Sequence, residues 1–302
     1  MAEFLFPYEN YRKVQKALIL QIAEAVKQKQ NLLVHAPTGI GKTISSLASS
    51  LAYALEHKKT LIFLTPMHSQ HKIVVDTLKL IEEKCKVKLQ VVDFIGKKHM
   101  CIVGGIDLLS SSEFAAYCNE VRKKETCEYY VNYKDKVRRD IAAQSMTRPL
   151  HVEEVISLGK QHHICPFEIS AYVGKKANVI IADYFHVLSP SIQEYFFTRI
   201  NKKLDDCILI FDEAHHLPSK CRDLLSTTLS TLSLSAAQKE NIRFGFEFND
   251  ELKRLENILF KLGHNVTEEI LVKKEDLKFD PVFITSLKFA GEQVLVKQKR
   301  SF

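Results

Sequence analysis

The segment APTGIGKT, at residues 36–43, has the composition of a phosphate-binding loop. Glycines let the backbone wrap closely around phosphate groups, and successive N–H groups with the start of a helix supply positive potential. In such a loop Lys42 reaches the β- and γ-phosphates and the Thr43 hydroxyl binds Mg²⁺. The strict pattern begins with glycine, whereas this segment begins with Ala36, and a solvated glycine turn with a surface lysine is the alternative. The nucleotide-contacting residues that we expect are Ala36, Pro37, Thr38, Gly39, Ile40, Gly41, Lys42 and Thr43.

A second segment, ILIFDEAHHLP at residues 208–218, places two adjacent carboxylates directly after an apolar run. Such a run predicts a strand buried on both faces of a parallel sheet, and ligands bind beyond the carboxyl ends of these strands. In phosphate-loop NTPases a strand-end aspartate helps to hold Mg²⁺, a role that Asp212 fits. Glu213 is then placed to orient or deprotonate the attacking water. We therefore expect Glu213, Asp212 and Lys42 to be catalytic, with a solvated strand end as the alternative.

Apolar patterning predicts the elements that must position these residues. A first helix is expected from Tyr8 to about Gln28, with Val14 and Leu18 on its apolar face. A strand at 31–36 and a helix at 44–56 flank the phosphate loop. Further strands are predicted at 60–66, 89–96, 177–184 and 206–213. Strand–helix–strand units of this kind cross over right-handed and build parallel sheets, so the expected fold class is α/β.

The strand pattern is interrupted in one long segment and ends before the last quarter of the chain. Residues 97–166 carry four of the seven cysteines, and the sequence after Cys221 is helical in pattern. We therefore expect a discontinuous sheet domain at 1–96 and 167–222, an insert at 97–166 and a helical extension at 223–302.

Bulk composition indicates a globular protein. The 302 residues are 46% hydrophobic and 26% charged, which suits about two domains. The 43 Lys and Arg against 36 Asp and Glu give a formal charge of +7, mild support for a polyanionic partner. No apolar run approaches the ~20 residues of a spanning helix, and the start, MAEFLFPYENYRK, lacks a signal-peptide layout. We expect no membrane partner and an intracellular location, cytoplasmic or, in a eukaryote, nuclear.

The seven cysteines are ambiguous by spacing alone. No Cys-x-x-Cys pair occurs, and free cysteine is among the most buried residue types. Thiolates also suit both zinc and iron–sulfur clusters. Without export signals, metal binding or plain burial fits better than a disulfide framework.

The residues Asp212 to His215 spell the DEAH form of the Walker B motif of superfamily-two helicases. Together with PTGIGKT, the N-terminal FPYENYRKVQ and the segment HICPFEISAYVGKKANVIIADYFHVLSP, the sequence resembles the XPD/DinG group of iron–sulfur DNA helicases. The resemblance covers nearly the whole chain. It implies a RecA-like motor domain that binds ATP and Mg²⁺, an iron–sulfur insert and a helical Arch-like extension that is incomplete.

The resemblance also implies roles for single residues. Gln15, in an Arg-x-x-Gln pattern, would contact adenine, with helical packing as its alternative. His215 would couple the nucleotide site to movement of the motor. The segment with Thr65, His68 and Gln70 would touch single-stranded DNA, with a plain loop as its alternative. The ligands of a [4Fe–4S] cluster would be Cys101, Cys118, Cys127 and Cys165.

The implied function is an ATP-dependent DNA helicase, 5′ to 3′ by resemblance, acting in DNA repair or nucleic-acid remodelling. No second phosphate-site half follows in this sequence, so we expect a second polypeptide to supply the second RecA-like domain of a split or truncated helicase. One alternative is a nucleotide-regulated module that binds DNA or a partner without unwinding. The other is a zinc-containing interaction protein with a vestigial phosphate loop. Cations and aromatics alternate in the insert, which suits a nucleic-acid strand or a solvated helix face.

Overall fold

The computed structural model describes residues 4–226, 228–264, 266, 271–273 and 280–299. The chain divides into two compact units, Met1–Leu224 and Leu225–Phe302. The sheet and all of the expected ATP and cysteine residues lie in the first unit.

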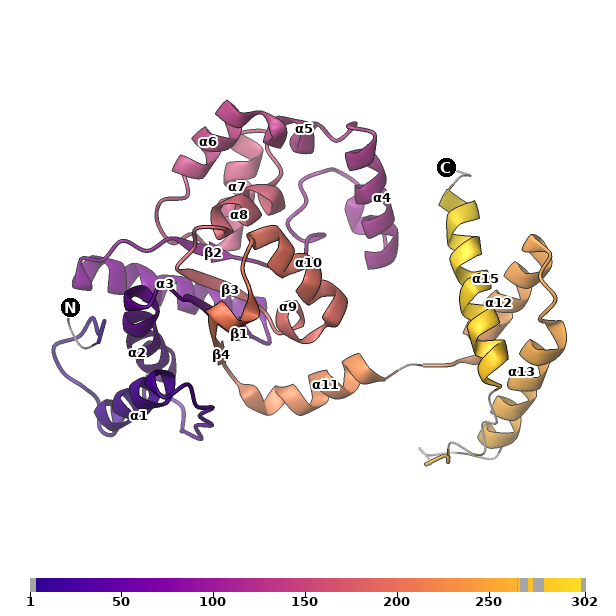
Figure 1. Cartoon of the computed structure of the whole chain (residues 1–302), viewed down its shortest axis with the longest axis horizontal. Helices are drawn as coiled ribbons and strands as arrows, with labels where there is room; N and C mark the ends of the chain where they lie inside the picture. Colours follow the sequence, from indigo (N-terminus) through magenta and orange to yellow (C-terminus); the bar gives the residue numbers. More distant parts are fainter. Residues whose placement is uncertain (1–3, 227, 265, 267–270, 274–279, 300–302) are drawn as a thin grey trace. The chain divides into compact units, whose positions relative to one another are not determined.

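A four-stranded sheet in the order β2-β3-β1-β4 forms the centre of the first unit (Figure 1). The strands are β1 (Thr60–Thr65), β2 (Val91–Asp93), β3 (Val179–Asp183) and β4 (Cys207–Phe211). All three pairings are parallel, and Leu61 of β1 lies opposite Val179 of β3 and Ile208 of β4. The carboxyl ends of the strands therefore meet at one edge, which brings Asp183 and Asp212 to the same side. The parallel α/β sheet predicted from the sequence is confirmed.

Alternate residues of the strands enter two separate apolar layers. Leu61 and Phe63 pack with helices α2 (Lys42–Glu56) and α3 (His68–Cys85). Ile62 and Leu64 pack on the opposite face with α6 (Lys136–Gln144), α7 (Val152–Gln161), α8 (Pro166–Gly174) and α10 (Pro190–Ile200). This alternation is the two-residue period of strands covered on both faces.

The cysteine-bearing segment 97–166 shares the core of the sheet. Its buried residues Met100, Met146 and Leu150 belong to the same apolar cluster as Ile62 and Leu64 of β1. The segment contains η1 (Ile106–Leu108), α4 (Ser111–Lys123), α5 (Glu128–Lys134), α6 and α7 (Figure 1). Because these side chains pack against one face of the sheet, they fix the position of the segment on the sheet.

The remaining elements complete the two units. The first unit also contains α1 (Gln15–Lys27), α9 (Phe185–Leu188), η2 (Leu204–Asp206), η3 (Ala214–His216) and most of α11 (Leu217–Leu225). The second contains α12 (Thr231–Phe244), α13 (Asn249–Gly263) and α15 (Pro281–Lys299), around a small core of Leu234, Leu252, Leu255 and Phe283. Parts of the expected helical extension at 223–302 lie outside the described residues. None of the described helices combines the length and apolar character needed to cross a bilayer.

Two expectations about strands are wrong. Residues 31–36 form no strand, and Leu33 is 87% exposed. A strand needs a neighbour for its backbone N–H and C=O groups, and no described strand pairs with this segment. The strand before Asp212 is half-buried instead of buried on both faces, because β4 pairs with β1 alone among the described strands.

The first helix and the strand near residue 90 are shorter than expected. α1 begins at Gln15, and Val14, expected on its apolar face, has φ 60° and is 61% exposed. The Arg12 N–H donates to Gln15 Oε1 at 2.9 Å, and this local bond ends the helix before Tyr8 is reached. The strand predicted at 89–96 is ordered as β2 over three residues only.

Candidate functional site

The loop at 36–43 leads directly into α2, whose first residue is Lys42. Gly39 and Gly41 both have φ 84°, a left-handed conformation that side chains rarely adopt. A Cβ on Gly41 would also collide with the Gln15 side chain. The two glycines therefore fit the loop through backbone shape at both positions and through close packing at Gly41.

Arg12 and Gln15 contact the glycines of this loop. Gln15 is 2% exposed, and its side chain lies against Gly41. Arg12 donates from Nη1 to the Gly39 carbonyl, and its N–H donates to Gln15 Oε1. The contact of Gln15 in this structure is thus with the loop itself, and the adenine contact stays a proposal. Arg12 was not among the expected site residues, although the Arg-x-x-Gln spacing already placed it one helical turn from Gln15.

Lys42 connects the loop to the acidic strand end. Its Nζ lies 3.9 Å from Glu213 Oε1 and donates to the Ala36 carbonyl at 3.3 Å. Both side chains of the pair are about one-third exposed, at 33% for Lys42 and 32% for Glu213. The structure therefore brings together the two segments that the sequence places about 170 residues apart.

Asp212 is fixed by its backbone and lies in a desolvated place. Its N–H donates to the Leu64 carbonyl at 2.9 Å, and Tyr184 Oη donates to the Asp212 carbonyl. Burial, with the nearby charge of Glu213, raises the pKa of the Asp212 carboxyl above its ordinary value. The same surroundings raise the pKa of Tyr184 to about 12. A carboxylate that lacks water in this way is stabilised by a bound cation, which suits a Mg²⁺ ligand.

Glu213 adopts a left-handed backbone, with φ 53°. This conformation costs a non-glycine residue ~1–2 kcal/mol and is found at sites where the orientation of a side chain matters. The Glu213 carboxylate faces two side-chain nitrogen atoms, Lys42 Nζ at Oε1 and His215 Nδ1, which lies 3.2 Å from Oε2. His215 thereby contacts the carboxylate that we expect to act on water.

The residues expected to touch DNA differ in accessibility. Thr65 is wholly buried, and its hydroxyl donates to the Met67 carbonyl at 3.0 Å. Its position at the end of β1, between two strands, explains the burial. The expected contact of this segment with DNA stays a prediction. His68 is exposed, and its Nε2 lies 3.1 Å from Asp183 Oδ1. Gln70 lies in the first turn of α3 with a buried Oε1 that has no hydrogen-bond partner.

A buried His–Asp pair lies beside this segment. His71 Nδ1 is 2.5 Å from Asp93 Oδ1, and both side chains are wholly buried. Asp93 Oδ2 accepts from the Val152 N–H at the start of α7, at 2.9 Å. The pair therefore joins α3, β2 and α7 through one carboxylate.

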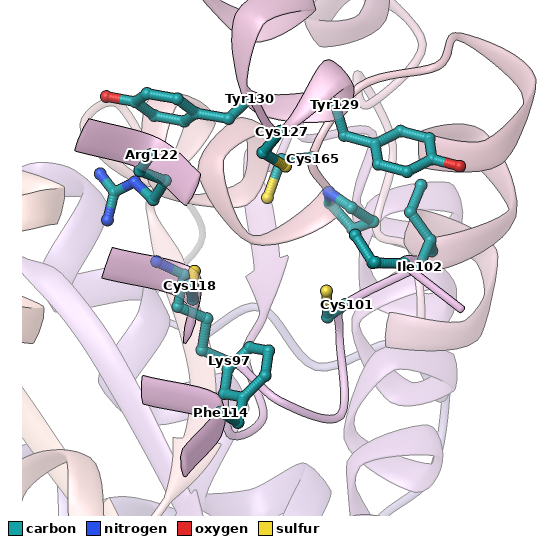
Figure 2. A pocket seen from close by; sticks show the side chains of 12 residues that line it. Lys97, Cys101, Ile102, Phe114, Cys118, Arg122, Cys127, Tyr129, Tyr130 and Cys165 are labelled. Carbon is teal, nitrogen blue, oxygen red and sulfur yellow. The ribbon is translucent and has the colours of Figure 1, made fainter. Parts of the chain in front are cut away.

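The four expected cysteine ligands line one small cavity (Figure 2). Cys101 follows β2, Cys118 is on α4, Cys127 precedes α5 and Cys165 precedes α8. Figure 2 shows their sulfur atoms turned towards a common space. The Cys165 N–H donates to the Tyr129 carbonyl at 3.0 Å, which holds the starts of α5 and α8 together. The structure thus gathers four thiols from separate elements at one place.

The chemistry of this donor set fits a thiolate-ligated metal group. Burial raises the pKa of Cys165 to about 12 and raises that of Cys101, while the charge of Lys97 opposes both shifts. A buried thiol remains protonated unless a cationic centre binds its thiolate. The described residues contain no group of three or more His, Cys, Asp or Glu side chains placed to hold a single metal ion. All seven cysteines are free thiols in the structure, and Cys85, Cys207 and Cys221 do not line the cavity.

Two protein families match the sequence. The family described as DEAD_2 matches residues 63–234, and the family described as DEAD/DEAH box helicase matches residues 12–113. The first range includes Asp212, Glu213 and all four cavity cysteines, and the second includes Gln15 and the phosphate loop.

Curated relatives align with most of this chain. A probable ATP-dependent helicase of Methanocaldococcus jannaschii is 30% identical over 95% of this chain and 42% of its own length. A regulator of telomere elongation helicase 1 homolog of Caenorhabditis briggsae is 26% identical over 87% of this chain and 28% of its own length. The XPD subunit of general transcription and DNA repair factor IIH of Arabidopsis thaliana is 23% identical, with 90% and 38% covered. The chain therefore spans less than half the length of these relatives.

The fold is also that of a solved structure named as an XPD helicase. The TM-score is 0.57 at 22% identity, and the match covers 97% of this chain and 48% of that chain. The recognition made from the DEAH motif and the phosphate loop is confirmed. The chain belongs to the DEAD_2 family, and its fold matches 48% of the solved XPD helicase chain.

Proposed function

We propose that this chain is the N-terminal motor half of an ATP-dependent DNA helicase that moves 5′ to 3′ and acts in DNA repair or nucleic-acid remodelling. The observation that carries the proposal is the 3.9 Å approach of Lys42 Nζ to Glu213 Oε1. This approach supports the proposal, because phosphoryl transfer requires a cation that binds the phosphates, here Lys42, close to a carboxylate that directs the attacking water, here Glu213. The helicase names of the relatives support the same reaction class.

The chain's own groups would divide the work of hydrolysis. On nucleotide binding, Lys42 exchanges the Ala36 carbonyl and Glu213 for oxygens of the β- and γ-phosphates. Glu213, released from that pair, orients the attacking water and accepts its proton. Thr43 and Asp212 would hold Mg²⁺, which neutralises charge on the phosphates when bound. The loop N–H groups around Gly39 and Gly41 supply the remaining positive potential.

Single-stranded DNA is the proposed nucleic-acid substrate. His68 is an exposed side chain of the segment after β1, and its Nε2 lies 3.1 Å from Asp183 Oδ1 at the end of β3. We assign its contact to a DNA phosphate or base, with Gln70 two residues further along α3. His215, through its 3.2 Å contact with Glu213, is the proposed link between nucleotide state and movement.

The cysteine cavity is assigned to a [4Fe–4S] cluster held by Cys101, Cys118, Cys127 and Cys165. When bound, such a cluster supplies a thiolate-linked cross-link between the elements that carry its ligands. In this chain those elements are the loop after β2 and helices α4, α5 and α8. Iron and acid-labile sulfide in the purified protein are the expected result, and stoichiometric zinc in a colourless protein contradicts the assignment.

A second RecA-like domain completes the proposed enzyme. Residues 37–39 of the phosphate loop are exposed, so the site is open to a covering partner. In related NTPases an arginine finger from such a partner contributes ~10³–10⁵ in rate. We propose that a second polypeptide of a split or truncated helicase supplies this domain, and that this chain alone binds ATP weakly and hydrolyses it poorly.

The test measures single-strand-stimulated ATPase of the purified chain, alone and with a polypeptide that carries the second motor domain. Low turnover alone, restored by the partner and lost again with Glu213→Gln, supports the proposal. Turnover typical of a complete helicase from this chain alone removes the need for a partner. Nucleotide-dependent DNA binding that never leads to hydrolysis, even with the partner, favours a nucleotide-regulated binding module.

A further inference from the structure

Glu168 on α8 is a wholly buried carboxylate surrounded by three cations. Lys97 Nζ lies 3.6 Å and Arg122 Nη2 3.3 Å from Glu168 Oε1, and Arg199 forms an ion pair with Oε2. These residues come from the loop after β2, from α4 and from α10, so the cluster connects the cysteine-bearing segment to the sheet domain. Three positive charges surround one negative charge, so the four side chains carry a net charge of +2. A buried network with balanced charges would carry no such excess.

Two of the three cations also line the cysteine cavity. Lys97 and Arg122 both belong to its wall (Figure 2). Arg199 does not line it. Glu168 itself lies three residues after Cys165, in the first turn of the same helix. The surplus positive charge is therefore directed at the four thiols.

Aromatic rings hold the two cavity cations in place. The Arg122 guanidinium lies 4.5 Å from the centre of the Tyr130 ring, and the Lys97 ammonium lies 5.2 Å from the centre of the Phe167 ring. Cation–π contacts of this kind are strongest where water is excluded. With Glu168 on one side and rings on the other, both cations have fixed positions instead of the free motion of surface side chains.

We propose that Glu168 is a positioning residue that holds Lys97 and Arg122 as a fixed counter-charge for an anionic, four-thiolate group in the cavity. This inference rests on the proposed function, which places an iron–sulfur cluster there. Four thiolates make such a cluster a net anion, and one-electron reduction adds further negative charge. Nearby positive charge favours the reduced form of the iron–sulfur cluster. Glu168 and its cations therefore set the midpoint potential of that cluster as well as its stability.

The proposal gives opposite signs for two neutral substitutions. Glu168→Gln removes the negative charge but keeps an amide oxygen that accepts hydrogen bonds from the cations, so the cations stay at the cavity and the midpoint potential shifts to a more positive value. Lys97→Met removes a cation from the cavity wall, so the potential shifts to a more negative value. Lys97→Arg keeps the charge and restores the potential of the unsubstituted protein. Lys124→Met is the matched control, because Lys124 follows α4, pairs with Glu120 and does not line the cavity.

The experiment is a redox titration of the purified holoprotein with dithionite as reductant, followed by visible absorbance and electron paramagnetic resonance. Iron and sulfide content are measured first, and their absence from the unsubstituted protein overturns the cluster assignment and this inference with it. With the cluster present, opposite shifts for E168Q and K97M support the proposal. Shifts of the same sign, or none, overturn it. If E168Q loses its iron, K97M and K97R decide, and K97M at the unsubstituted potential overturns the proposal.

Discussion

The Nζ of Lys42 at the start of α2 lies 3.9 Å from Oε1 of Glu213 after β4. Each charge occupies a position that a nucleotide would use, Lys42 for phosphate and Glu213 for water. Their contact in the absence of nucleotide neutralises two groups that are each about two-thirds covered by protein. Under the proposed function, nucleotide binding separates this pair and so links the occupancy of the loop to the release of the Glu213 carboxylate.

Replacing Lys42 with alanine should weaken ATP binding by roughly 10–100-fold, because hydrogen bonds to a charged group contribute about 1.5–3 kcal/mol. A fluorescent ATP analogue titrated into the protein measures the change. Lys16→Ala is the matched control, since Lys16 is an exposed cation on α1 and lies outside the loop sequence. Equal affinity of K42A and the unsubstituted protein would mean that the loop is vestigial.

Asp212→Asn should raise the melting temperature of the nucleotide-free protein at neutral pH. The pKa of Asp212 is raised by burial and by Glu213, so its ionised form opposes folding at every pH above that raised pKa. The gain should shrink as the pH falls through the raised pKa and vanish below the ordinary pKa of aspartate, where the carboxyl is protonated in both the folded and the unfolded state.

Differential scanning fluorimetry across pH measures this effect, with the exposed Asp223→Asn as control. Addition of Mg²⁺ with ATP should stabilise the unsubstituted protein more than D212N. A lower melting temperature for D212N at neutral pH would show that the carboxylate is not desolvated in solution.

Gly159→Ala should destabilise the protein by roughly 1–3 kcal/mol, the usual cost of overpacking. A Cβ at Gly159 on α7 would lie 2.5 Å from Pro166 Cγ and 3.0 Å from the Ile164 carbonyl oxygen. Because Pro166 follows Cys165, iron at the proposed cluster site should also be lost faster, which iron analysis over time measures. Gly104→Ala, where no atom lies within 4 Å of the added Cβ, is the control within the same segment.

Asp93→Ala should lower the free energy of unfolding by roughly 2–4 kcal/mol, since it leaves buried hydrogen-bonding groups without a partner. The groups affected are His71 Nδ1 and the Val152 N–H. Urea titration measures the change. Asp76→Ala, at an exposed position on α3, should alter stability by about 0.5 kcal/mol or less. Similar losses for the two variants would show that the His71–Asp93 pair contributes little.

The sequence predicts correctly those elements whose burial follows from their own residue pattern. The helix at 44–56 and the strands at 60–66 and 177–184 match α2, β1 and β3 within a few residues, because their apolar period and their burial agree. Residues 31–36 have an equally apolar pattern, but the strand state depends on a neighbouring strand, which no local pattern reveals.

The same limit applies to the sites. Phosphate-loop and DEAH residues are contiguous motifs, so their chemistry can be read from short segments. Thr65 also lies in a motif, but its burial comes from strands on both sides of β1. The cations around Glu168 are far from it in sequence and reach it only when the chain folds. A lone glutamate after Cys-Pro-Phe carries no local signal of a buried charge cluster.

The half-buried strand β4 has one further consequence for anyone who handles this protein. Within the described residues it pairs with β1 alone, and its row Ile208, Leu209 and Ile210 is apolar. An edge strand of this kind offers unpaired backbone N–H and C=O groups to any extended peptide that reaches it. Self-association should therefore increase with protein concentration, and preparations should stay monodisperse longest when they are kept dilute.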